Sequence, residues 1–324
     1  MSEPLRDVDS IVQNFNQLED PRSTVNQRHL LGDLIVICIM GVIAGADGPL
    51  AIGIWAKNNK RWLMQRLQLP NGIPSHDTIG RLLTALSPVG FQSCFESWIA
   101  SITVGEDKVD LRQIAVDGKV LRRSHDKRNG LGPLWLVSAW AVDRGISLGQ
   151  LATDEKSNEI TAIPQLLANL ELTDSVVTID AAGCQRAIAR QIIDAKGDYV
   201  FSLKGNQSKL QDAVSSYIET HMENNFAYIK ARTFMETLKG HGRVDEITYY
   251  QMPVPADLVN RELGAGLKAI GVAIRISQCG DVCTSEVRYY ISSIGMGVKR
   301  FGRLVRGHWA IENTLHWCLD VTFR

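Results

Sequence analysis

The hydrophobic pattern changes its period near residue 105, and this change divides the chain into two parts. Residues 1–105 carry helical patterns, with apolar side chains recurring on one face. From about residue 110, short apolar runs bounded by turn residues indicate strands, and helical patterns separate the later runs. We therefore expect a helical N-terminal domain over 1–105 and an α/β domain over 110–324.

Four helices are predicted in the first part. They cover 27–44, 50–67, a segment that includes TIGRLLTAL, and 91–102. The sequence LPNGIPSHD interrupts the helical pattern, and Ser75 or Asp77 is the expected cap of the helix that follows. Two short helices joined by a tight turn are compatible with a helix-turn-helix and also with plain helical packing, so both interpretations stay open.

The second part predicts the order β-β-β-α-β-α-β. Its strands are RQIAVDGKVL, LWLVSAWAV, ISLGQLATD, SVVTIDAAG and DYVFSLKG, and its helices are NEITAIPQLLANL and QRAIARQIIDAKG. Successive strands favour an antiparallel meander, whereas strands separated by helices favour parallel crossovers. A mixed sheet with helices on both faces follows. Residues 208–285 begin with a polar helix at 209–224 and continue with alternating patterns, which predict a strand-rich insertion.

The run VKRFGRLVRGHWAIENTLHWCLD predicts one amphipathic helix near the end. Its apolar stripe consists of Phe301, Leu304, Val305, His308, Trp309, Leu315, His316 and Leu319, and the cations opposite are Lys299, Arg300, Arg303 and Arg306. Glu312 falls in the middle of the stripe. Because an unpaired buried carboxylate costs several kcal/mol, we expect Glu312 to have a partner: Arg288, a neighbouring histidine or a metal ion.

The composition constrains which binding partners are expected but does not identify one. The 324 residues include 35 basic and 35 acidic side chains, so any surface for nucleic acid has to be local. The opening MSEPLRDVDS is polar, unlike a secretory signal. The most apolar run, residues 34–46, is shorter than the roughly 20 residues that a bilayer requires. We expect a buried helix there, and a cytoplasmic protein with no membrane partner.

The cysteines favour a turn over a metal site. Of six cysteines, only Cys279 and Cys283 are close together in the sequence, and a lone CxxxC is weak evidence for zinc. Gly280 and Asp281 lie between them and favour a hairpin turn.

Three carboxylates carry the candidate chemistry. Asp117 in IAVDGK and Asp180 in VVTIDAAG each stand where an apolar strand ends, and Glu312 stands on the last helix. Ends of neighbouring strands lie at one edge of a sheet, so these side chains are expected to meet in one cleft and hold Mg²⁺. Two ions about 4 Å apart would serve phosphoryl transfer. The alternatives are turn aspartates and an ion-paired glutamate.

A set of motifs in order resembles a known family. The motifs are DPRSTVNQRHLLGDL, GADG, LPNGIPSHDTIGRLL, IAVDGKVLRRS, LVSAWA, DEKSNEITAIPQLL, TIDAAGCQ, DYVFSLKGNQ, GHGR, RYYISS and RGHWAIENTLHWCLDV. Together, from about residue 18 to residue 324, they resemble the H-repeat-associated family of bacterial insertion-sequence transposases. Each motif alone is weak, but eleven in the same order are specific.

The resemblance implies a DDE transposase with a ribonuclease H-like catalytic core and an N-terminal transposase-associated helical domain. By motif position, Asp117, Asp180 and Glu312 correspond to the catalytic, metal-binding carboxylates. The implied cofactor is Mg²⁺, two ions, with Mn²⁺ as a substitute. The implied reaction is attack by water, and then by a DNA 3′-hydroxyl, on a phosphodiester. The implied partners are double-stranded DNA, at the element ends and the target, and further copies of the chain assembled on that DNA.

Four cations near these carboxylates are candidates for binding DNA phosphates. They are Lys119, Arg122, Arg123 and Arg306. The alternative for each is a solvated surface cation. Two further motifs have no settled role: GHGR, and the polar cluster of Glu155, Lys156 and Glu159, which is expected to border the cleft or to cap a helix.

Members of the resembled family continue for some tens of residues beyond the equivalent of Phe323. We therefore expect a C-terminally truncated copy whose activity is in question. Two alternatives follow: a non-catalytic remnant that still binds element DNA, and a ribonuclease H-like nuclease with a role in DNA repair.

Overall fold

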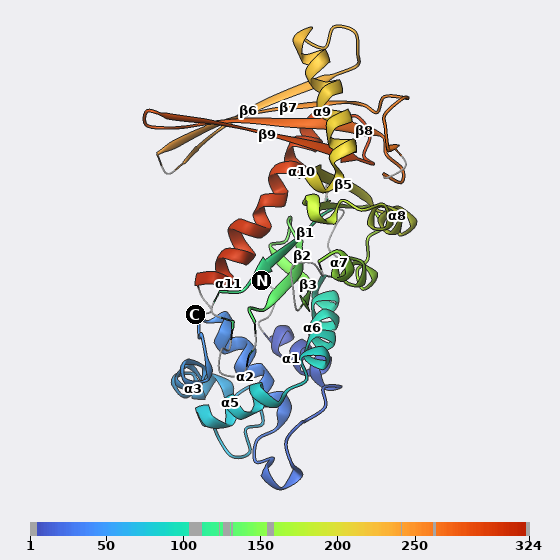
Figure 1. The fold of residues 1–324 in the computed structure, drawn as a ribbon. Coiled ribbons are helices and arrows are strands. Elements are labelled where there is room, and N and C mark those ends of the chain that lie inside the picture. The colour runs from blue at the N-terminus through green and yellow to red at the C-terminus, as the bar shows by residue number, and fades with distance from the viewer. Residues whose placement is uncertain are drawn as a thin grey trace. The chain divides into compact units, whose positions relative to one another are not determined.

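The computed structural model describes residues 5–103, 112–122, 124–125, 130, 132–153, 159–240, 242–261 and 264–321 (Figure 1). The chain divides into two compact units, residues 1–108 with 317–324 and residues 109–316. The described elements of the first unit are α1 (Leu5–Phe15), η1 (Thr24–Asn26), α2 (Leu31–Ile43), α3 (Pro49–Asn58), α4 (Lys60–Leu63), α5 (His76–Ala85), α6 (Pro88–Thr103) and α11 (Trp317–Val321).

Helix α2 contributes five consecutive buried residues, Leu34 to Cys38, to the core of the first unit. The expected buried helix at 34–46 is therefore confirmed, and among the described residues no helix is long and apolar enough to cross a membrane. Helix α5 begins after Ser75, whose Oγ accepts a hydrogen bond from the Thr78 amide at 3.2 Å. The predicted helix over 50–67 is divided at Asn59 into α3 and α4.

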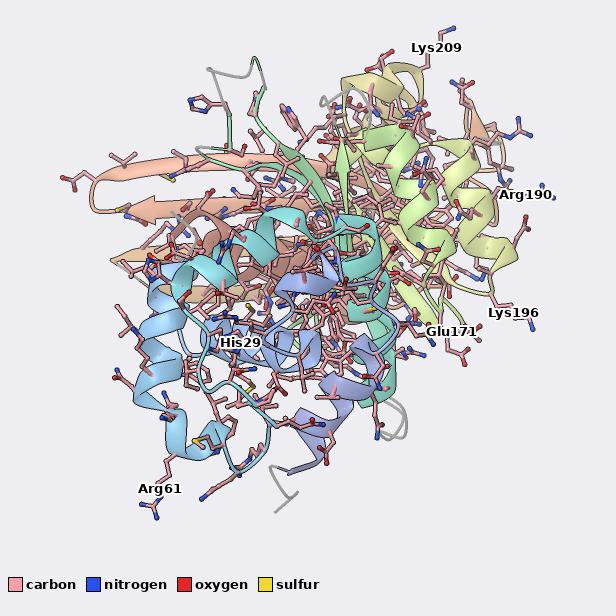
Figure 2. All side chains as sticks on the ribbon, turned by 90° about the horizontal axis from the view of Figure 1, so that it is seen from below. His29, Arg61, Glu171, Arg190, Lys196 and Lys209 are labelled. Atoms are coloured by element: carbon pink, nitrogen blue, oxygen red, sulfur yellow. The ribbon has the colours of Figure 1, made fainter. Side chains whose placement is uncertain are left out.

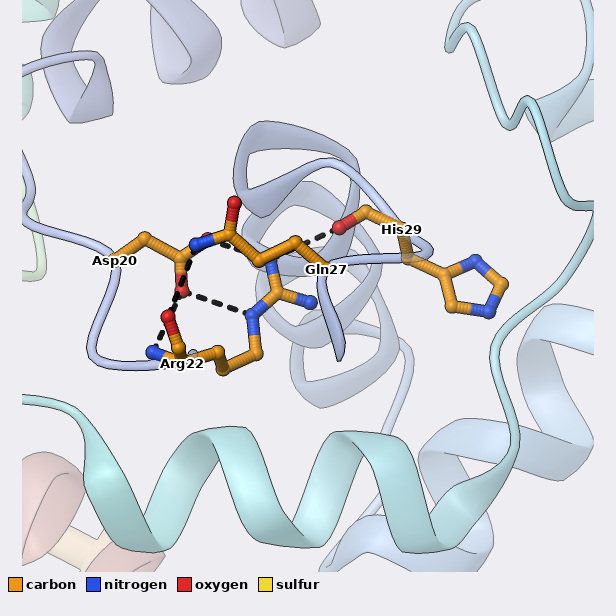
Figure 3. Close-up of polar contacts among 4 residues, drawn as sticks. All are labelled: Asp20, Arg22, Gln27 and His29. Carbon is orange, nitrogen blue, oxygen red and sulfur yellow. Dashed lines mark hydrogen bonds and ion pairs between the residues drawn. The ribbon is translucent and has the colours of Figure 1, made fainter. Parts of the chain in front are cut away.

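A polar clamp fixes the loop that precedes α2. Arg22 donates from Nε and Nη2 to the two carboxylate oxygens of Asp20, at 2.9 and 2.7 Å, and from Nη2 to the carbonyl of His29 at 2.9 Å (Figure 3). Gln27 Nε2 donates to the Arg22 carbonyl at 3.0 Å. The hydrogen bond from Arg22 lowers the pKa of Asp20. This bidentate pair gives the motif DPRSTVNQRH a structural role.

The second unit is a mixed α/β structure with one large sheet. Its described strands are β1 (Arg112–Val120), β2 (Trp135–Ala141), β3 (Ile146–Thr153), β4 (Ser175–Ile179), β5 (Asp198–Leu203), β6 (Arg232–Gly240), β7 (Arg243–Pro253), β8 (Ala269–Cys279) and β9 (Val282–Ser292). Its described helices are α7 (Glu159–Ala168), η3 (Ala181–Gly183), α8 (Arg186–Asp194), η4 (Gly205–Gln207), α9 (Ser208–Glu223), α10 (Val298–Ala310) and the π-helical segment η6 (Ile311–His316).

The described strands form one sheet in the order β3-β2-β1-β4-β5-β9-β8-β7-β6. Strands β1, β4 and β5 are parallel, whereas β2, β3 and β9 run antiparallel to their neighbours. The predicted meander and crossovers are both present. The segment expected as an insertion adds β6–β9 to this same sheet, because β9 pairs with β5. The hairpin expected at Gly280 is confirmed, since Cys279 pairs with Val282.

Alternation along the strands sorts side chains onto two faces. On one face Ile114, Val177 and Phe201 pack in the core that α7, α8 and α9 cover. On the other face Val176, Val200 and the residues beside them pack under α10. Helix α10 contacts β6 and β7 at one end of the sheet and also reaches β1 and β4 (Figure 1). Odd-numbered residues of β1 and even-numbered residues of β4 therefore face α10.

The last helix differs from its prediction. Phe301, Leu304 and Val305 are buried as the stripe predicts, but regular α-helix ends at Ala310 and a π-helical segment follows. A π-helical turn contains more residues than an α-helical turn, so the later positions rotate relative to a straight helix. Ile311 becomes the buried residue and Glu312 is exposed. The expectation that Glu312 lies on the buried stripe is therefore wrong.

Candidate active site

Two of the predicted carboxylates lie side by side on neighbouring strands. The parallel register of β1 and β4 ends with Val116 opposite Ile179, so Asp117 and Asp180 occupy the next position on each strand. Both fall on the face under α10. Asp117 is not at the end of β1, as the sequence suggested, because pairing with β2 continues to Val120. It lies where β1 and β4 stop pairing.

Local hydrogen bonds orient these two carboxylates. Asp117 Oδ1 accepts from the Gly118 amide at 2.9 Å. Asp180 Oδ1 accepts from the Ala182 amide at 3.0 Å and so caps η3. Each side chain keeps a second oxygen for other partners. Backbone amides of the next one or two residues thus orient both carboxylates, and for Asp180 that amide belongs to the turn η3.

Asp117, Asp180 and Glu312 all line one small cavity of ≈ 100 Å³, which we call the carboxylate pocket. Its other polar lining residues are Thr178, Ser202, Lys204, Arg288 and His308. The structure thus brings the three predicted carboxylates to one pocket, although they are far apart in the sequence. Lys204 and Arg288 are its lining cations, and the sequence had not singled out Lys204.

The carboxylates repel one another through this pocket. Burial raises the pKa of Asp117 to about 7, and the negative charges of Asp180 and Glu312 act in the same direction. The amide of Gly118 opposes the shift, and Glu159 adds to it. Like charges in a poorly solvated place favour the binding of a cation or a proton. The pocket thus holds three carboxylates against two cations, Lys204 and Arg288, and Arg288 also pairs with Glu286.

Two histidines of the predicted stripe lie beside this cluster. His316 is buried, with Nδ1 3.7 Å from Asp117 Oδ2. His308 lies with Nδ1 3.1 Å from Thr178 Oγ1, and its Nε2 has no hydrogen-bond partner among the described residues. Burial lowers the pKa of His308 to about 4, so its ring is neutral at pH 7. A neutral imidazole does not compensate the carboxylates.

The expected partners of Glu312 are engaged elsewhere. Arg288 pairs with Glu286 at 2.7 Å, and His316 lies beside Asp117, with Nδ1 3.7 Å from its Oδ2. Glu312 influences Arg288 only through its charge, as one of several groups that raise the pKa of Arg288 against the effect of burial. Exposure makes a partner for Glu312 unnecessary, because water solvates its carboxylate.

Gln113 fastens α10 to the sheet and was missed by the sequence analysis. Its buried Nε2 donates to Thr178 Oγ1 at 3.0 Å and to the Leu304 carbonyl of α10 at 2.7 Å. Gly307 permits this approach, because a Cβ there would collide with the Gln113 amide. The sequence did contain a signal for this role: Gln113 is a polar amide side chain within the otherwise apolar strand segment RQIAV.

Glu159 lies close to Gly118, the residue after Asp117 in the chain. It is buried at the start of α7, and a Cβ on Gly118 would collide with its carboxylate. Of the polar cluster that the sequence left open, Glu155 and Lys156 lie outside the described residues. Glu159 lies in the first turn of α7 and raises the pKa of Asp117 through its charge, but it is not among the lining residues of the carboxylate pocket.

The predicted DNA-binding cations lie around the pocket rather than in its lining. Lys119 is half-buried on β1, Arg122 is exposed just after it, and Arg306 pairs with Glu236 at 2.7 Å. Arg123 lies outside the described residues.

The chemistry of the carboxylate pocket suits a hard cation, since its donors are carboxylate oxygens. Among the described residues, however, no group of three His, Cys, Asp or Glu side chains converges closely enough to hold a metal ion. Glu312 is the exposed member of the three. Metal binding would therefore require these carboxylates to come closer together than they do here.

Comparison with known proteins identifies the family. Residues 12–99 match the family described as DDE_Tnp_1-associated, and residues 109–324 match the family described as Transposase DDE domain. The chain is 36% identical to the "H repeat-associated putative transposase YhhI" of Escherichia coli K12, over 96% of this chain and 82% of that protein.

Two further relatives agree in length and similarity. The "Putative transposase YncI" of Escherichia coli O157:H7 is 37% identical over 97% of this chain and 80% of that protein. An "Uncharacterized protein in dhlA 3'region" of Xanthobacter autotrophicus is 43% identical over 86% of this chain and 92% of that protein. The two family matches together span most of the chain, and the chain therefore belongs to the DDE transposase family, with H repeat-associated transposases among its relatives.

Proposed function

We propose that this insertion-sequence transposase is catalytic and that Asp117, Asp180 and Glu312 are its active-site carboxylates. The observation that carries the proposal is the meeting of all three in one pocket of ≈ 100 Å³. The raised pKa of Asp117 supports it, because structural carboxylates seldom share a poorly solvated site without cations. The strand order β3-β2-β1-β4-β5 supports a ribonuclease H-like core within the larger sheet.

The proposed reaction exchanges one phosphodiester oxygen for another. Water attacks a phosphorus atom at the element end, and the bond to a bridging oxygen breaks to release a 3′-hydroxyl. That hydroxyl attacks a target phosphodiester and displaces a second 3′-hydroxyl. Two divalent ions, Mg²⁺ or Mn²⁺, would supply activation of the attacking oxygen and stabilisation of the leaving oxygen when bound.

The residues of the chain have separate parts in this proposal. Asp117 and Asp180 are held by local backbone amides and would bind the ions from the sheet, whereas Glu312 would complete the site from the π-helical segment. Lys204 and Arg288 line the pocket and would attract the phosphate. His316 would orient Asp117. Lys119, Arg122, Arg123 and Arg306 would bind phosphates farther along the double-stranded DNA, on which copies of the chain would assemble.

The division of labour between the two units is also a proposal. Residues 1–105 would be the helical transposase-associated domain, and residues 110–324 the catalytic domain, with 208–285 as its insertion. Matches at residues 12–99 and 109–324 support the position of this boundary.

Cleavage assays with three single substitutions test the proposal. Asp117→Asn, Asp180→Asn and Glu312→Gln each remove one charge with little change of volume. Each is expected to reduce Mg²⁺-dependent cleavage of duplex DNA that carries the element ends by roughly 10³-fold or more. Asp194→Asn is the matched control, because Asp194 is an exposed carboxylate on α8 paired with Arg190. Full activity in all three variants would falsify the proposal.

A non-catalytic DNA-binding role is the second candidate. The observations in its favour are that Glu312 is exposed and that, among the described residues, no three carboxylate, histidine or cysteine side chains converge closely enough to hold a metal ion. The same assay decides between the two, because a binding protein would retain affinity for the DNA but cleave it in no variant and at no Mg²⁺ concentration.

A further inference from the structure

The GHGR motif forms the tight turn between β6 and β7. Gly240 pairs with Arg243 across the end of the hairpin, and Gly242 has a φ of +73°, in the region that favours glycine. His241 lies outside the described residues. Because side chains two apart on a strand share a face, Arg243 and Asp245 project to the same side. The motif thus fixes where Arg243 starts β7.

Arg243 belongs to a cluster that the carboxylate pocket does not contain. A second cavity, of ≈ 430 Å³, is lined by arginines from β7, β8, β9 and α10, and we call it the arginine pocket. The lining arginines are Arg243, Arg275, Arg288 and Arg306. These residues lie far apart in the sequence, and the pairing of β6–β9 under α10 brings them together.

Two acids, Asp245 and Glu236, contact arginines of this pocket and are less exposed than those arginines. Asp245 Oδ2 accepts from Arg275 Nη2 at 3.0 Å and lies 3.1 Å from Arg243 Nε. The Asp245 side chain is 11% exposed, whereas that of Arg243 is 52% exposed. Glu236 and Arg306 repeat this arrangement, with 17% and 44% exposed. The acids therefore hold one side of guanidinium groups that are more exposed than the acids themselves.

Trp309 fixes two of the arginines and joins the two pockets. The guanidinium carbons of Arg275 and Arg288 lie 5.6 and 5.2 Å from the centre of its ring, within the range of cation–π contacts. Trp309, Arg288 and Glu312 line both cavities. Anything bound in the arginine pocket is therefore next to the carboxylate pocket.

The arginine pocket gathers four guanidinium groups. Its described charged lining residues are these four arginines together with the carboxylates of Asp245 and Glu312. Glu236 and Glu286, outside that lining, pair with Arg306 and Arg288. The buried Arg275 Nε has no acceptor among the described residues. The whole chain has no net charge, so this concentration of arginines is local. Guanidinium forks match phosphate oxygens in geometry as well as in charge.

We propose that the arginine pocket binds the sugar-phosphate backbone of the DNA strand that enters the carboxylate pocket, and that the GHGR turn serves to place Arg243 there. This inference rests on the proposed function, which supplies the DNA strand. If one phosphate of that strand reacts at the carboxylates, the neighbouring phosphates of the same strand must lie beside them. The cavity, of ≈ 430 Å³, is larger than a single phosphate requires. We expect it to hold the strand through its phosphates, regardless of base sequence.

Binding of labelled DNA to the full chain tests the inference. Fluorescence anisotropy with a random-sequence duplex and a random-sequence single strand, in EDTA, measures affinity without cleavage. Arg243→Gln and Arg306→Gln are each expected to weaken binding about 3- to 10-fold and to reduce the slope of log K against log salt by about one. Arg243→Lys is expected to retain the slope and recover part of the affinity, because it keeps the charge but not the fork.

Arg190→Gln is the matched control. Arg190 is exposed on α8 and paired with Asp194, and its side chain points outward from the body of the unit (Figure 2). It should change neither the affinity nor the slope. Thermal melts establish that each variant is folded.

The outcomes separate this inference from the proposed function. If Arg243→Gln and Arg306→Gln bind like Arg190→Gln, the inference is overturned. Free ATP and unlabelled DNA are compared as competitors of the labelled DNA at the same concentration of phosphate. If ATP displaces the labelled DNA as effectively as the unlabelled DNA does, the pocket is a nucleotide site and the inference is also overturned. If the arginine variants weaken binding while the three carboxylate variants still cleave, the proposed function fails and the strand-binding site stands.

Discussion

The carboxylate pocket and the arginine pocket share Arg288, Trp309 and Glu312, but their charges are organised in opposite ways. In the first, like charges on β1, β4 and η6 surround a cavity of ≈ 100 Å³, and burial leaves them poorly solvated. In the second, of ≈ 430 Å³, Arg243, Arg275 and Arg306 contact acids that are more buried than they are. The first pocket sets carboxylates beside one another, whereas the second pairs its acids with arginines.

The pKa of Asp117 in the first pocket and that of Asp245 in the second are shifted in opposite directions. Burial raises the pKa of Asp117, and neighbouring carboxylates reinforce the rise. Burial would also raise the pKa of Asp245, but hydrogen bonds from Ser277 and Arg275 and the charges of Arg275 and Arg243 outweigh it, so the pKa is lowered. The same residue type therefore destabilises the fold in one pocket and stabilises it in the other. Three predictions test the comparison, from the largest expected effect to the smallest.

The largest effect concerns the pH dependence of stability in EDTA. Since the pKa of Asp117 is about 7 in the folded chain, against an ordinary value of 3.8, the folded state binds a proton more readily than the unfolded state. As pH falls from about 7 to about 4, Asp117 should therefore raise the free energy of unfolding, by a few kcal/mol at about 1.4 kcal/mol per unit.

His308 acts in the other direction over part of this range. Its pKa is lowered from 6.5 to about 4, so the stability of the folded chain falls as pH drops below the ordinary value. The measurement is therefore the difference between denaturation curves of the wild type and Asp117→Asn at each pH. The variant should be the more stable at pH 7 and lose its advantage by pH 4. A difference that is constant over this range contradicts the repulsion between the carboxylates.

The intermediate effect concerns the acid beneath the arginines. Asp245→Asn removes a charged acceptor from Arg275, Arg243 and Ser277, so we expect a loss of about 2 kcal/mol in the free energy of unfolding at pH 7. Because the pKa of Asp245 is lowered, its contribution is present above the ordinary value near 3.8 and is lost as pH falls through the folded value. Urea denaturation at pH 7 measures the effect, with Asp194→Asn as the exposed control. If Asp245→Asn is as stable as that control, the charge of Asp245 does not stabilise the folded arrangement of the arginines.

The smallest effect concerns the turn of GHGR. Gly242→Ala forces a side chain onto a φ of +73°, which costs about 1 kcal/mol. No described atom lies within 4 Å of the added Cβ, so the cost is in the backbone alone. Thermal melting should show a small decrease. Gly205→Ala is the control, since Gly205 has equal space and no such backbone angle. Equal melting temperatures for the two variants would mean that the turn can change its conformation without cost.

Much of the local structure could be predicted from the sequence. The strands β1–β5, the helices between them and the cap at Ser75 follow from short-range period and capping, because these depend on residues within one or two turns. The nearness of Asp117 and Asp180 was also predictable, since both follow apolar strands that a helical crossover makes parallel neighbours. Glu312 was singled out by its place on the apolar stripe of the last helix, and the family motifs supported its inclusion.

Other features depend on contacts that no local pattern contains. The pairing of β9 with β5 extends the sheet to β6 and so creates the arginine pocket from four separate strands and a helix. Gln113 holds α10 against β1, and Glu312 lines the pocket from a π-helical segment where the sequence predicted regular helix. The sequence by itself determined the elements and the acidic residues, because hydrophobic period and motif position are local. Only the tertiary structure decided which charges face one another, because that depends on sheet register and on how one helix packs across it.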